Sequence, residues 1–329
     1  MTHSAVAYSS TAAASVQRPP ATFHETLDRA ADLLQSQDPY CPMEAIRVLR
    51  DGMHAARREF ADEFAWRRFI KEGPRRHRAL TLAHQDPFIA RAFAKPRGYP
   101  GDAVILDFIY RHPANRRYIA ESTPAGRASV GFSTNTPAPR AVRNRAWLLA
   151  NEIDAVCART PGAQILSMAC GHLREAADSV ALQSGAAGRL LAVDQDAASL
   201  AVVQDESSAF GVEVAECSVR SLLAREVRLG RFDFIYAAGL FDYLNDQVAG
   251  CSVAALFELL KPGGKLWVAN FQPGIVDRAF MESFMDWWLT YRSAEDMFRI
   301  ASAVPAYACA SRRTFLEHES NIVFLELCR

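Results

Sequence analysis

Residues 164–175 read QILSMACGHLRE, a short apolar run followed by small residues and then by charged ones. The apolar part, Gln164–Met168, is predicted to be a buried strand. Small residues at 169–171 let the backbone approach a ligand closely, and the helix expected after them would direct its N-terminal amides at that ligand. By itself this single-glycine loop is a weak signal, because an ordinary turn between a strand and a helix can look the same.

Downstream of this stretch, short apolar runs alternate with helical segments. Further strands are predicted at 190–193, 212–215, 232–237, 265–270, near 305–310 and at 322–327, and helices at 174–183, 197–210, 219–226 and 248–260. Strands and helices that alternate at this spacing form a parallel sheet with right-handed crossovers. The second half of the chain is therefore expected to be a Rossmann-like α/β unit.

The first half has a different pattern. Apolar residues at helical spacing, such as Leu27, Ala30 and Leu34, predict a first helix. Further helices are expected at 43–56, at 60–70 with Phe60, Phe64 and Ile70 on one side, at 76–84, around 89–93 and at 103–110. We divide the chain into a tail at residues 1–20 that is expected to be disordered, an all-helical cap or substrate domain at 21–135 and an α/β domain at 136–329.

Composition narrows the classes of function. The 37 basic residues balance the 37 acidic ones, which argues against a nucleic-acid partner. A basic run at 67–78 is interpreted as a solvated helix end. No stretch approaches the roughly 20 apolar residues that a membrane span needs. The seven cysteines are widely spaced without a C-x-x-C pair, so we expect neither disulfides nor a metal site. Reduced thiols are typical of the cytoplasm, which is the location that we expect.

The second predicted strand ends in an acidic residue. Asp194 follows Gly171 by about 20 residues, a position from which a carboxylate can accept hydrogen bonds from both ribose hydroxyls of an adenosine. A small-residue loop and a strand-end acid fit both NAD and S-adenosylmethionine (SAM). The G-x-G-x-x-G fingerprint of a pyrophosphate-binding loop is missing, which tells against NAD.

Three later segments favour SAM. Cys217-Ser218-Val219 follow the third strand, where a side chain can meet the adenine edge. The fourth strand, FDFIYA at 232–237, opens into AGLFDY, and LLKPGGKL at 259–266 combines a helix end, a tight turn and a strand. Together these segments resemble class I SAM-dependent methyltransferases over roughly residues 160–328. The resemblance implies a mostly parallel seven-stranded sheet with a reversed final strand, SAM as cofactor, S-adenosylhomocysteine (SAH) as product, and no metal.

The loop after the first strand departs from the usual pattern of that class, acid-x-Gly-x-Gly-x-Gly. Ser167 replaces the acid, Ala169 and Leu173 replace the outer glycines, and Gly171 is retained. Without the acid, the SAM amino group needs other partners, such as the carbonyls of residues 169 and 238 or the Glu175 carboxylate. The predicted cofactor-binding residues are Ala169, Cys170, Gly171, His172, Glu175, Asp194, Gln195, Ser218, Val219, Ala238, Gly239 and Leu240.

The helical half carries motifs of its own. HQDPF at 84–88, KPRGYPGDA at 95–103 and NTPAPRAVRNR at 135–145 precede the small-residue loop and GLFDYL at 239–244. In this order they are similar to the bacterial methyltransferases that make 3-hydroxypalmitate methyl ester, a quorum-sensing signal. This resemblance covers nearly all of residues 25–328. It implies a helical cap and a small-molecule acceptor, with carboxyl O-methylation of a fatty or hydroxy acid as the leading reaction.

Candidate substrate-binding residues come from three places. In the Pro/Gly-rich loop at 95–102, Arg97, Tyr99 and Asp102 either line a substrate mouth or form a connector locked by an internal Arg–Asp pair. Among the arginines at 140, 143 and 145, Arg143 is the first choice for a carboxylate. Phe284, Trp287 and Tyr291 are predicted to share one helix face, a pattern more typical of a core than of a pocket. The predicted substrate-binding set is Arg97, Tyr99, Asp102, Arg143, Phe241, Trp287, Tyr291 and Arg292.

The acceptor atom determines whether a catalytic base is needed. A carboxylate nucleophile needs none, whereas a hydroxyl or an amine does. His172 and Tyr243 are the candidate bases, and Asp242 is expected to fix a loop instead. O- or N-methylation of a non-carboxylate natural product is the close alternative, and a non-catalytic SAM-binding sensor or scaffold is the alternative from another class. The expected partner is a small molecule, and the sequence is also compatible with a homodimer.

Overall fold

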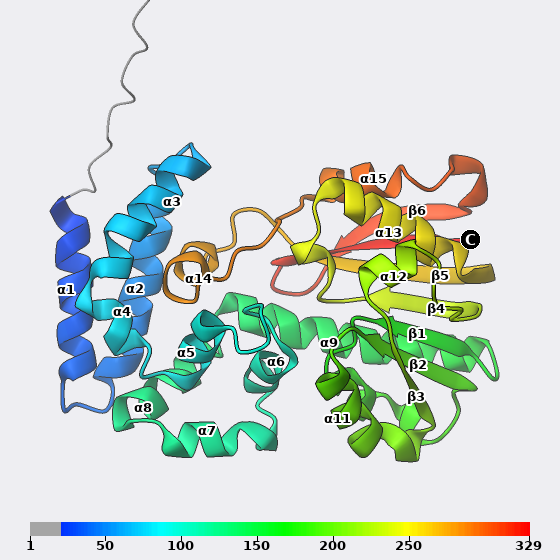
Figure 1. Ribbon diagram of the computed structural model, residues 1–329, viewed down its shortest axis with the longest axis horizontal. Coiled ribbons are helices and arrows are strands. Elements are labelled where there is room, and N and C mark those ends of the chain that lie inside the picture. The colour runs from blue at the N-terminus through cyan, green and yellow to red at the C-terminus, as the bar shows by residue number, and fades with distance from the viewer. Residues whose placement is uncertain (1–20) are drawn as a thin grey trace, which may run out of the picture.

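A computed structural model describes residues 21–329, so the predicted tail at 1–20 lies outside the described residues. A group of N-terminal helices lies beside an α/β unit built on one sheet (Figure 1). The N-terminal helices are α1 (Ala21–Gln35), α2 (Cys41–Arg57), α3 (Glu63–Glu72), α4 (Arg78–Ala83), α5 (Pro87–Ala94), α6 (Ala103–Ile109), α7 (Arg116–Glu121) and α8 (Pro124–Ser133).

Most of these helices are short and begin at a side-chain cap. Asp62, Asp86, Asp102 and Thr123 accept hydrogen bonds from backbone N–H groups in the first turns of α3, α5, α6 and α8. Such caps satisfy amides that have no partner inside the helix. The buried face of α3 is formed by Trp66, Phe69 and Ile70, whereas Phe64 is exposed. The expectation that Phe64 belongs to this face was wrong, because it lies on the opposite side of the helix.

The sheet has seven strands in the order β3-β2-β1-β4-β5-β7-β6. All neighbouring pairs are parallel except those of β7, which runs antiparallel to both β5 and β6. The mostly parallel sheet with one reversed final strand is thereby confirmed. The strands are β1 (Gln164–Met168), β2 (Arg189–Asp194), β3 (Val212–Glu216), β4 (Phe232–Ala237), β5 (Leu260–Phe271), β6 (Ser311–Leu316) and β7 (Ile322–Cys328).

Two predicted elements differ from the structure. The strand expected near 305–310 begins at Ser311 instead, since Pro305 leads into a 3-10 turn at Ala306–Ala308. The helix expected at 174–183 is a 3-10 helix, Arg174–Asp178, followed by the short α10 (Val180–Gln183). Ser179 separates the two because its extended backbone and its hydroxyl cap α10.

Helices cover both faces of the sheet, and alternate residues of each strand point to opposite faces. Ile165 belongs to the core under α9 (Pro137–Arg159), α10 and α11 (Ala197–Ser207), and Leu166 to the core under α12 (Val219–Leu223), α13 (Asp246–Glu258) and α15 (Ala294–Ala301). The first core continues without a break into the N-terminal helices, so the two halves share buried surface. The domain boundary at 135/136 therefore stays a prediction.

A segment between β5 and β6 connects the two halves. Its helix α14 (Arg278–Phe284) packs on α2 (Figure 1), and Glu282 Oε2 accepts a hydrogen bond of 2.6 Å from Trp66 Nε1. Between Phe284 and α15 the chain is not helical, because Asp286 has a left-handed backbone with φ of +47°. The predicted helix face joining Phe284 to Tyr291 was therefore wrong. The Asp286 carboxylate binds Lys95 and Arg75 from the N-terminal half. None of the helices between residues 21 and 329 is long and apolar enough to span a membrane.

Candidate active site

A cavity of about 570 Å³ lies where the carboxyl ends of β1, β2 and β4 meet. Met168, Asp194 and Gly239, at or just beyond the ends of these strands, all line it. The order of the strands reverses between β1 and β4, and ligands of open α/β sheets bind at such a switch point. The cavity is therefore located where the topology predicts a binding site.

The loop after β1 has an unusual backbone. Ala169, Gly171 and Leu173 all have left-handed conformations, with φ of +55°, +56° and +50°. These are the three positions that glycines occupy in the usual methyltransferase pattern. The loop thus adopts the glycine-type conformation although two of its residues are not glycine. A left-handed backbone costs a residue with a Cβ roughly 1–2 kcal/mol, so the surrounding structure must hold the loop in place.

Asp194 supports this loop and faces the cavity. Its Oδ2 accepts a hydrogen bond of 2.9 Å from Gly171 N, and its Oδ1 one of 2.9 Å from Asp196 N. The residue is buried but lines the cavity. A carboxylate has about four lone-pair sites, so Asp194 can still accept two hydroxyl donors. This satisfies the requirement for a ribose-binding acid.

Eight of the predicted cofactor-binding residues line this cavity. Ser218 stands at its rim as the cap of α12, accepting a hydrogen bond of 3.1 Å from Ser221 N. Cys217 also lines the cavity, although the sequence analysis did not select it as a binding residue. The eight are Ala169, Gly171, Asp194, Gln195, Ser218, Val219, Gly239 and Leu240.

The remaining predicted cofactor residues, Cys170, His172, Glu175 and Ala238, line a second cavity of about 40 Å³ behind the loop. Glu175 is buried there and accepts a hydrogen bond of 2.8 Å from the Tyr236 hydroxyl. Burial raises the pKa of its carboxyl above the ordinary value. The small cavity shares Ala169 and Gly239 with the large one, so the two adjoin at the small-residue loop.

Arg145 lines both cavities, and the sequence analysis preferred Arg143. Arg145 donates from Nη1 to the Ala238 carbonyl at 2.6 Å, and its buried Nε has no hydrogen-bond partner within residues 21–329. Arg143 points elsewhere, donating from Nη1 to the carbonyls of Thr134 and Ile109. The apolar stripe of α9 would have identified Arg145, because the buried residues Ala141, Val142, Ala146 and Leu149 have the spacing that also places 145 inside.

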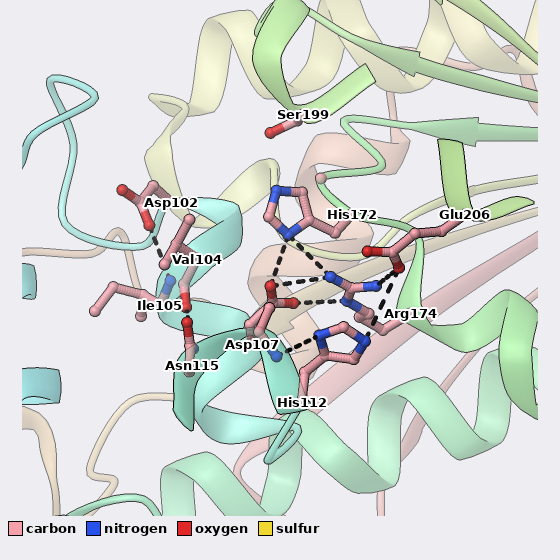
Figure 2. Close-up of polar contacts among 12 residues, drawn as sticks. Asp102, Val104, Ile105, Asp107, His112, Asn115, His172, Arg174, Ser199 and Glu206 are labelled. Atoms are coloured by element: carbon pink, nitrogen blue, oxygen red, sulfur yellow. Dashed lines mark hydrogen bonds and ion pairs between the residues drawn. The ribbon is translucent and has the colours of Figure 1, made fainter. Parts of the chain in front are cut away.

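His172, a candidate base, belongs to a polar network between the loop and α6. Figure 2 shows His172 and Arg174 pointing at Asp107, with His172 Nδ1 2.9 Å from Asp107 Oδ2 and Arg174 Nε 2.6 Å from Oδ1. The Nε2 of His172 is buried without a partner in the described chain. His172 does not line the large cavity. The arrangement makes it a support of the loop.

The Pro/Gly-rich loop at 95–102 lies along the large cavity. Arg97 lines it and donates from Nη1 to Asp196 Oδ2 at 2.6 Å, two residues beyond Asp194. Asp102 does not line it, because its carboxylate caps α6 and binds Arg91, at 2.6 Å from Nη2. The predicted internal Arg–Asp lock is therefore formed by Arg91 and not by Arg97.

Tyr99, Tyr243 and Trp287 meet where this loop approaches the end of β4. The Tyr99 and Tyr243 rings are in edge contact, and Trp287 Nε1 donates to the Tyr243 hydroxyl at 2.9 Å. All three line the cavity. A Cβ at Gly101 would collide with Tyr243 and Trp287, so only glycine allows this close approach. Burial raises the pKa of Tyr243 far above its ordinary value, which opposes its use as a base.

The rest of the cavity is enclosed by apolar side chains from the N-terminal helices, α9 and the segment after β5. They are Phe88, Leu106, Ile109, Val142, Phe280, Met281, Met285 and Leu289. None of the eight was selected from the sequence, because each resembles an ordinary core residue of its segment. Their convergence depends on contacts between segments far apart in the chain.

Besides Asp102 and Arg143, three further predicted substrate residues do not line the cavity. Phe241 is fully buried in the core on the other face of the sheet. Arg292 is buried and binds Asp246 and two backbone carbonyls, so it fixes the end of β4 and the start of α13. Tyr291 packs beneath Arg278, whose guanidinium carbon lies 4.6 Å from the ring centroid. Phe241, Arg292 and the Tyr291 ring thus have structural contacts already, whereas the buried Tyr291 hydroxyl has no hydrogen-bond partner within residues 21–329.

Asp242 lines the cavity beside Tyr243. Its Oδ1 accepts a hydrogen bond of 2.7 Å from Phe271 N, and its carbonyl accepts one of 2.7 Å from Thr290 N. The carboxylate therefore fixes the loop, and its second oxygen makes no hydrogen bond within the described residues. Burial raises the pKa of Asp242 to about 6, against the opposing charges of Arg145 and Arg292. A carboxylate of this pKa can exchange protons near neutral pH.

Comparison with solved structures finds one likeness over nearly the whole chain and weaker ones over parts of it. A protein from Bordetella parapertussis described as a possible exported protein has a TM-score of 0.57 at 15% identity, over 94% of this chain and 96% of its own. Magnesium protoporphyrin IX methyltransferase from Synechocystis PCC 6803 with bound SAH has a TM-score of 0.43 at 12% identity, over 58% and 87%. The SAM-dependent methyltransferase SibL has a TM-score of 0.48 at 12% identity, over 76% and 73%.

The likeness to the Bordetella parapertussis protein concerns the fold alone, because the identity is low. The strand order and the single reversed strand β7 are those of a methyltransferase-like α/β fold. No protein-family model matches the sequence. No curated protein matches it either.

Replacing Ala169 by glycine is expected to raise the free energy of unfolding by about 1 kcal/mol, since glycine adopts the left-handed backbone without a Cβ clash. Urea denaturation followed by circular dichroism measures the change. The matched control is Ala192→Gly in buried β2, which loses core contacts and should be less stable than the wild type. An Ala169→Gly variant no more stable than the wild type would show that the loop is not strained.

Proposed function

We propose that this protein is a SAM-dependent methyltransferase that acts on a small molecule. The observation that carries the proposal is one continuous cavity with two unlike parts. One part has the strand-end acid Asp194 and the loop at 169–171 of an adenosine site. The other part is enclosed by apolar side chains. A cofactor and an organic acceptor that must react with each other need such adjoining compartments.

The residues present fit SAM. Asp194 has lone pairs free for the ribose hydroxyls, and Cys217–Val219 lie at the rim where the adenine would bind. The methionine end requires a partner for its ammonium, which Glu175 supplies beside the small cavity. Glu175 thus replaces the acid that is missing at residue 167. When bound, SAM supplies an electrophilic methyl group on a sulfonium.

The leading reaction is carboxyl O-methylation of a fatty or hydroxy acid, as in the family that makes 3-hydroxypalmitate methyl ester. The Arg145 guanidinium borders the acceptor compartment and can orient a carboxylate beside it. The apolar walls exclude water, which would otherwise solvate the nucleophile. Positioning and exclusion of water are sufficient for a carboxylate, because it is already deprotonated at neutral pH.

Asp242 favours a second candidate, the methylation of a hydroxyl or an amine. Its free oxygen and its pKa of about 6 suit a general base beside the acceptor. In this reaction Asp242 would accept the proton of the nucleophile while Phe271 N–H holds its other oxygen in place. The non-catalytic sensor is less well supported, since a sensor of SAM needs no enclosed second compartment.

Asp194→Ala is expected to weaken SAM binding roughly 10- to 100-fold, because the ribose hydroxyls lose a charged acceptor. Calorimetry with SAM measures the dissociation constant. Asp205→Ala, an exposed position on α11, is the matched control and should bind SAM as the wild type does. Equal affinities of the Asp194 variant and the wild type would contradict the cofactor site.

Incubation with methyl-labelled SAM and an extract of the native host is expected to yield a labelled small molecule. The leading reaction predicts a methyl ester, so mild base should release the label as methanol. A label that withstands base would exclude carboxyl methylation and support the second candidate. Binding of SAM without any transfer, over a broad set of acceptors, would leave only the sensor.

If Asp242 is the base, kcat should fall as pH drops below about 6, because the protonated carboxyl cannot accept a proton. Asp242→Asn should lower kcat about 100-fold and remove this limb of the profile. Asp86→Asn is the matched control, because burial also raises the pKa of Asp86 to about 6 although that residue does not line the cavity. If the acceptor is a carboxylate, the pH profile of kcat should show no fall that depends on Asp242.

A further inference from the structure

The acceptor compartment extends far from the cofactor loop. Helix α9 has 23 residues and β1 has 5, so the helix is about 34 Å long and the strand about 16 Å. The chain reverses direction between them through the short turn at 160–163, so the first turn of α9 lies roughly 15 Å beyond the end of β1. In Figure 1 this end of α9 reaches the N-terminal helices. Thr136 and Ala138, at the start of α9, still line the cavity.

The distal end of the cavity contains a buried carboxylate. Asp277 lines it, is 2% exposed, and accepts a hydrogen bond of 2.6 Å from Ala138 N through Oδ2. Its Oδ1 is buried and makes no hydrogen bond within residues 21–329. Burial raises the pKa of Asp277, and the Ala138 N–H, the Arg50 charge and the Thr136 hydroxyl offset only part of this rise.

No cation pairs with Asp277 in the described part of the chain. Arg140 forms its ion pair with Glu319, and Arg50 forms its own with Asp51. Apart from the Thr136 hydroxyl, the first turn of α9 offers Asp277 no further donor, because Pro137 and Pro139 lack an N–H and the Ala138 N–H is already used. The distal end therefore has a surplus of acceptors, unlike an ordinary helix start, which attracts anions.

We propose that Asp277 Oδ1 determines specificity by accepting a hydrogen bond from a hydroxyl or amino group of the acceptor, at the end remote from the methylated atom. The assignment rests on the proposed function, which places the reacting group beside Arg145. An acceptor with a second carboxylate would meet the Asp277 charge and is rejected. An acceptor with a plain hydrocarbon end leaves Oδ1 without a partner and binds more weakly.

Asp277→Asn tests this assignment with little change in shape. The amide oxygen can keep the Ala138 N–H bond that holds α9, so the amide nitrogen replaces Oδ1. The polarity at this position is thereby reversed from acceptor to donor. The probes are straight-chain monocarboxylic acids of graded length, each with its terminally hydroxylated, terminally aminated and dicarboxylic counterparts. Calorimetry measures their binding to the SAH-loaded protein.

In the wild type, the best hydroxylated or aminated acid should bind about tenfold or more tightly than its plain counterpart, as expected for a hydrogen bond to a charged group. The dicarboxylic acid should bind most weakly. Asp277→Asn should abolish the preference for the donor and relieve the penalty on the dicarboxylic acid. The matched control Asp154→Asn, at a cap of α10, should keep the wild-type order.

The wild-type ranking tests the proposal even if the Asp277 variant fails to fold. Equal binding of substituted and plain acids, binding of no probe at all, or an unchanged ranking in Asp277→Asn would each overturn it. The proposed function fails separately, through the absence of SAM and SAH binding or of methyl transfer. A donor preference measured without methyl transfer would uphold the role of Asp277 and overturn only the reaction.

Discussion

The contact between Asp107 and the loop after β1 is the interaction on which the candidate site depends. Ala169 and Leu173 hold backbone conformations that residues with a Cβ avoid, and such strain persists only where neighbours impose it. Asp107 imposes it from α6, binding both His172 and Arg174. The N-terminal helices are consequently part of the support of the cofactor loop, in addition to enclosing the acceptor compartment.

The cavity combines groups of opposite charge along its length. Arg145 lies where β1 and β4 end, and Asp277 contacts the start of α9 through Ala138, with apolar walls between the two charged residues. In a medium of low polarity, charges and unpaired polar groups discriminate strongly between ligands. The same apolar walls bind any hydrocarbon of suitable size. Under the proposed function, two charged residues would orient the acceptor, while its affinity would come from the side chains between them.

Most of the fold follows from local pattern, whereas much of the site does not. The central strands are buried on both faces and form continuous apolar runs, as at 232–237, so the sequence predicts them directly. Edge strand β6 reads SRRTFL and is half exposed, and its place was misjudged. The preference for Arg143 over Arg145 was wrong, because the helix periodicity of α9 places Arg145 on the buried face. Asp277 was not selected, because its contact with Ala138 joins segments 139 residues apart.

The packing of α14 on α2 has a consequence for how the protein is made. The N-terminal core includes Phe280 and Phe284, which lie near the far end of a chain of 329 residues. A ribosome releases the early helices long before it has synthesised these partners. The first half must therefore wait with part of its apolar surface uncovered until translation is almost complete. Only completion of the C-terminal half supplies the side chains that cover this surface.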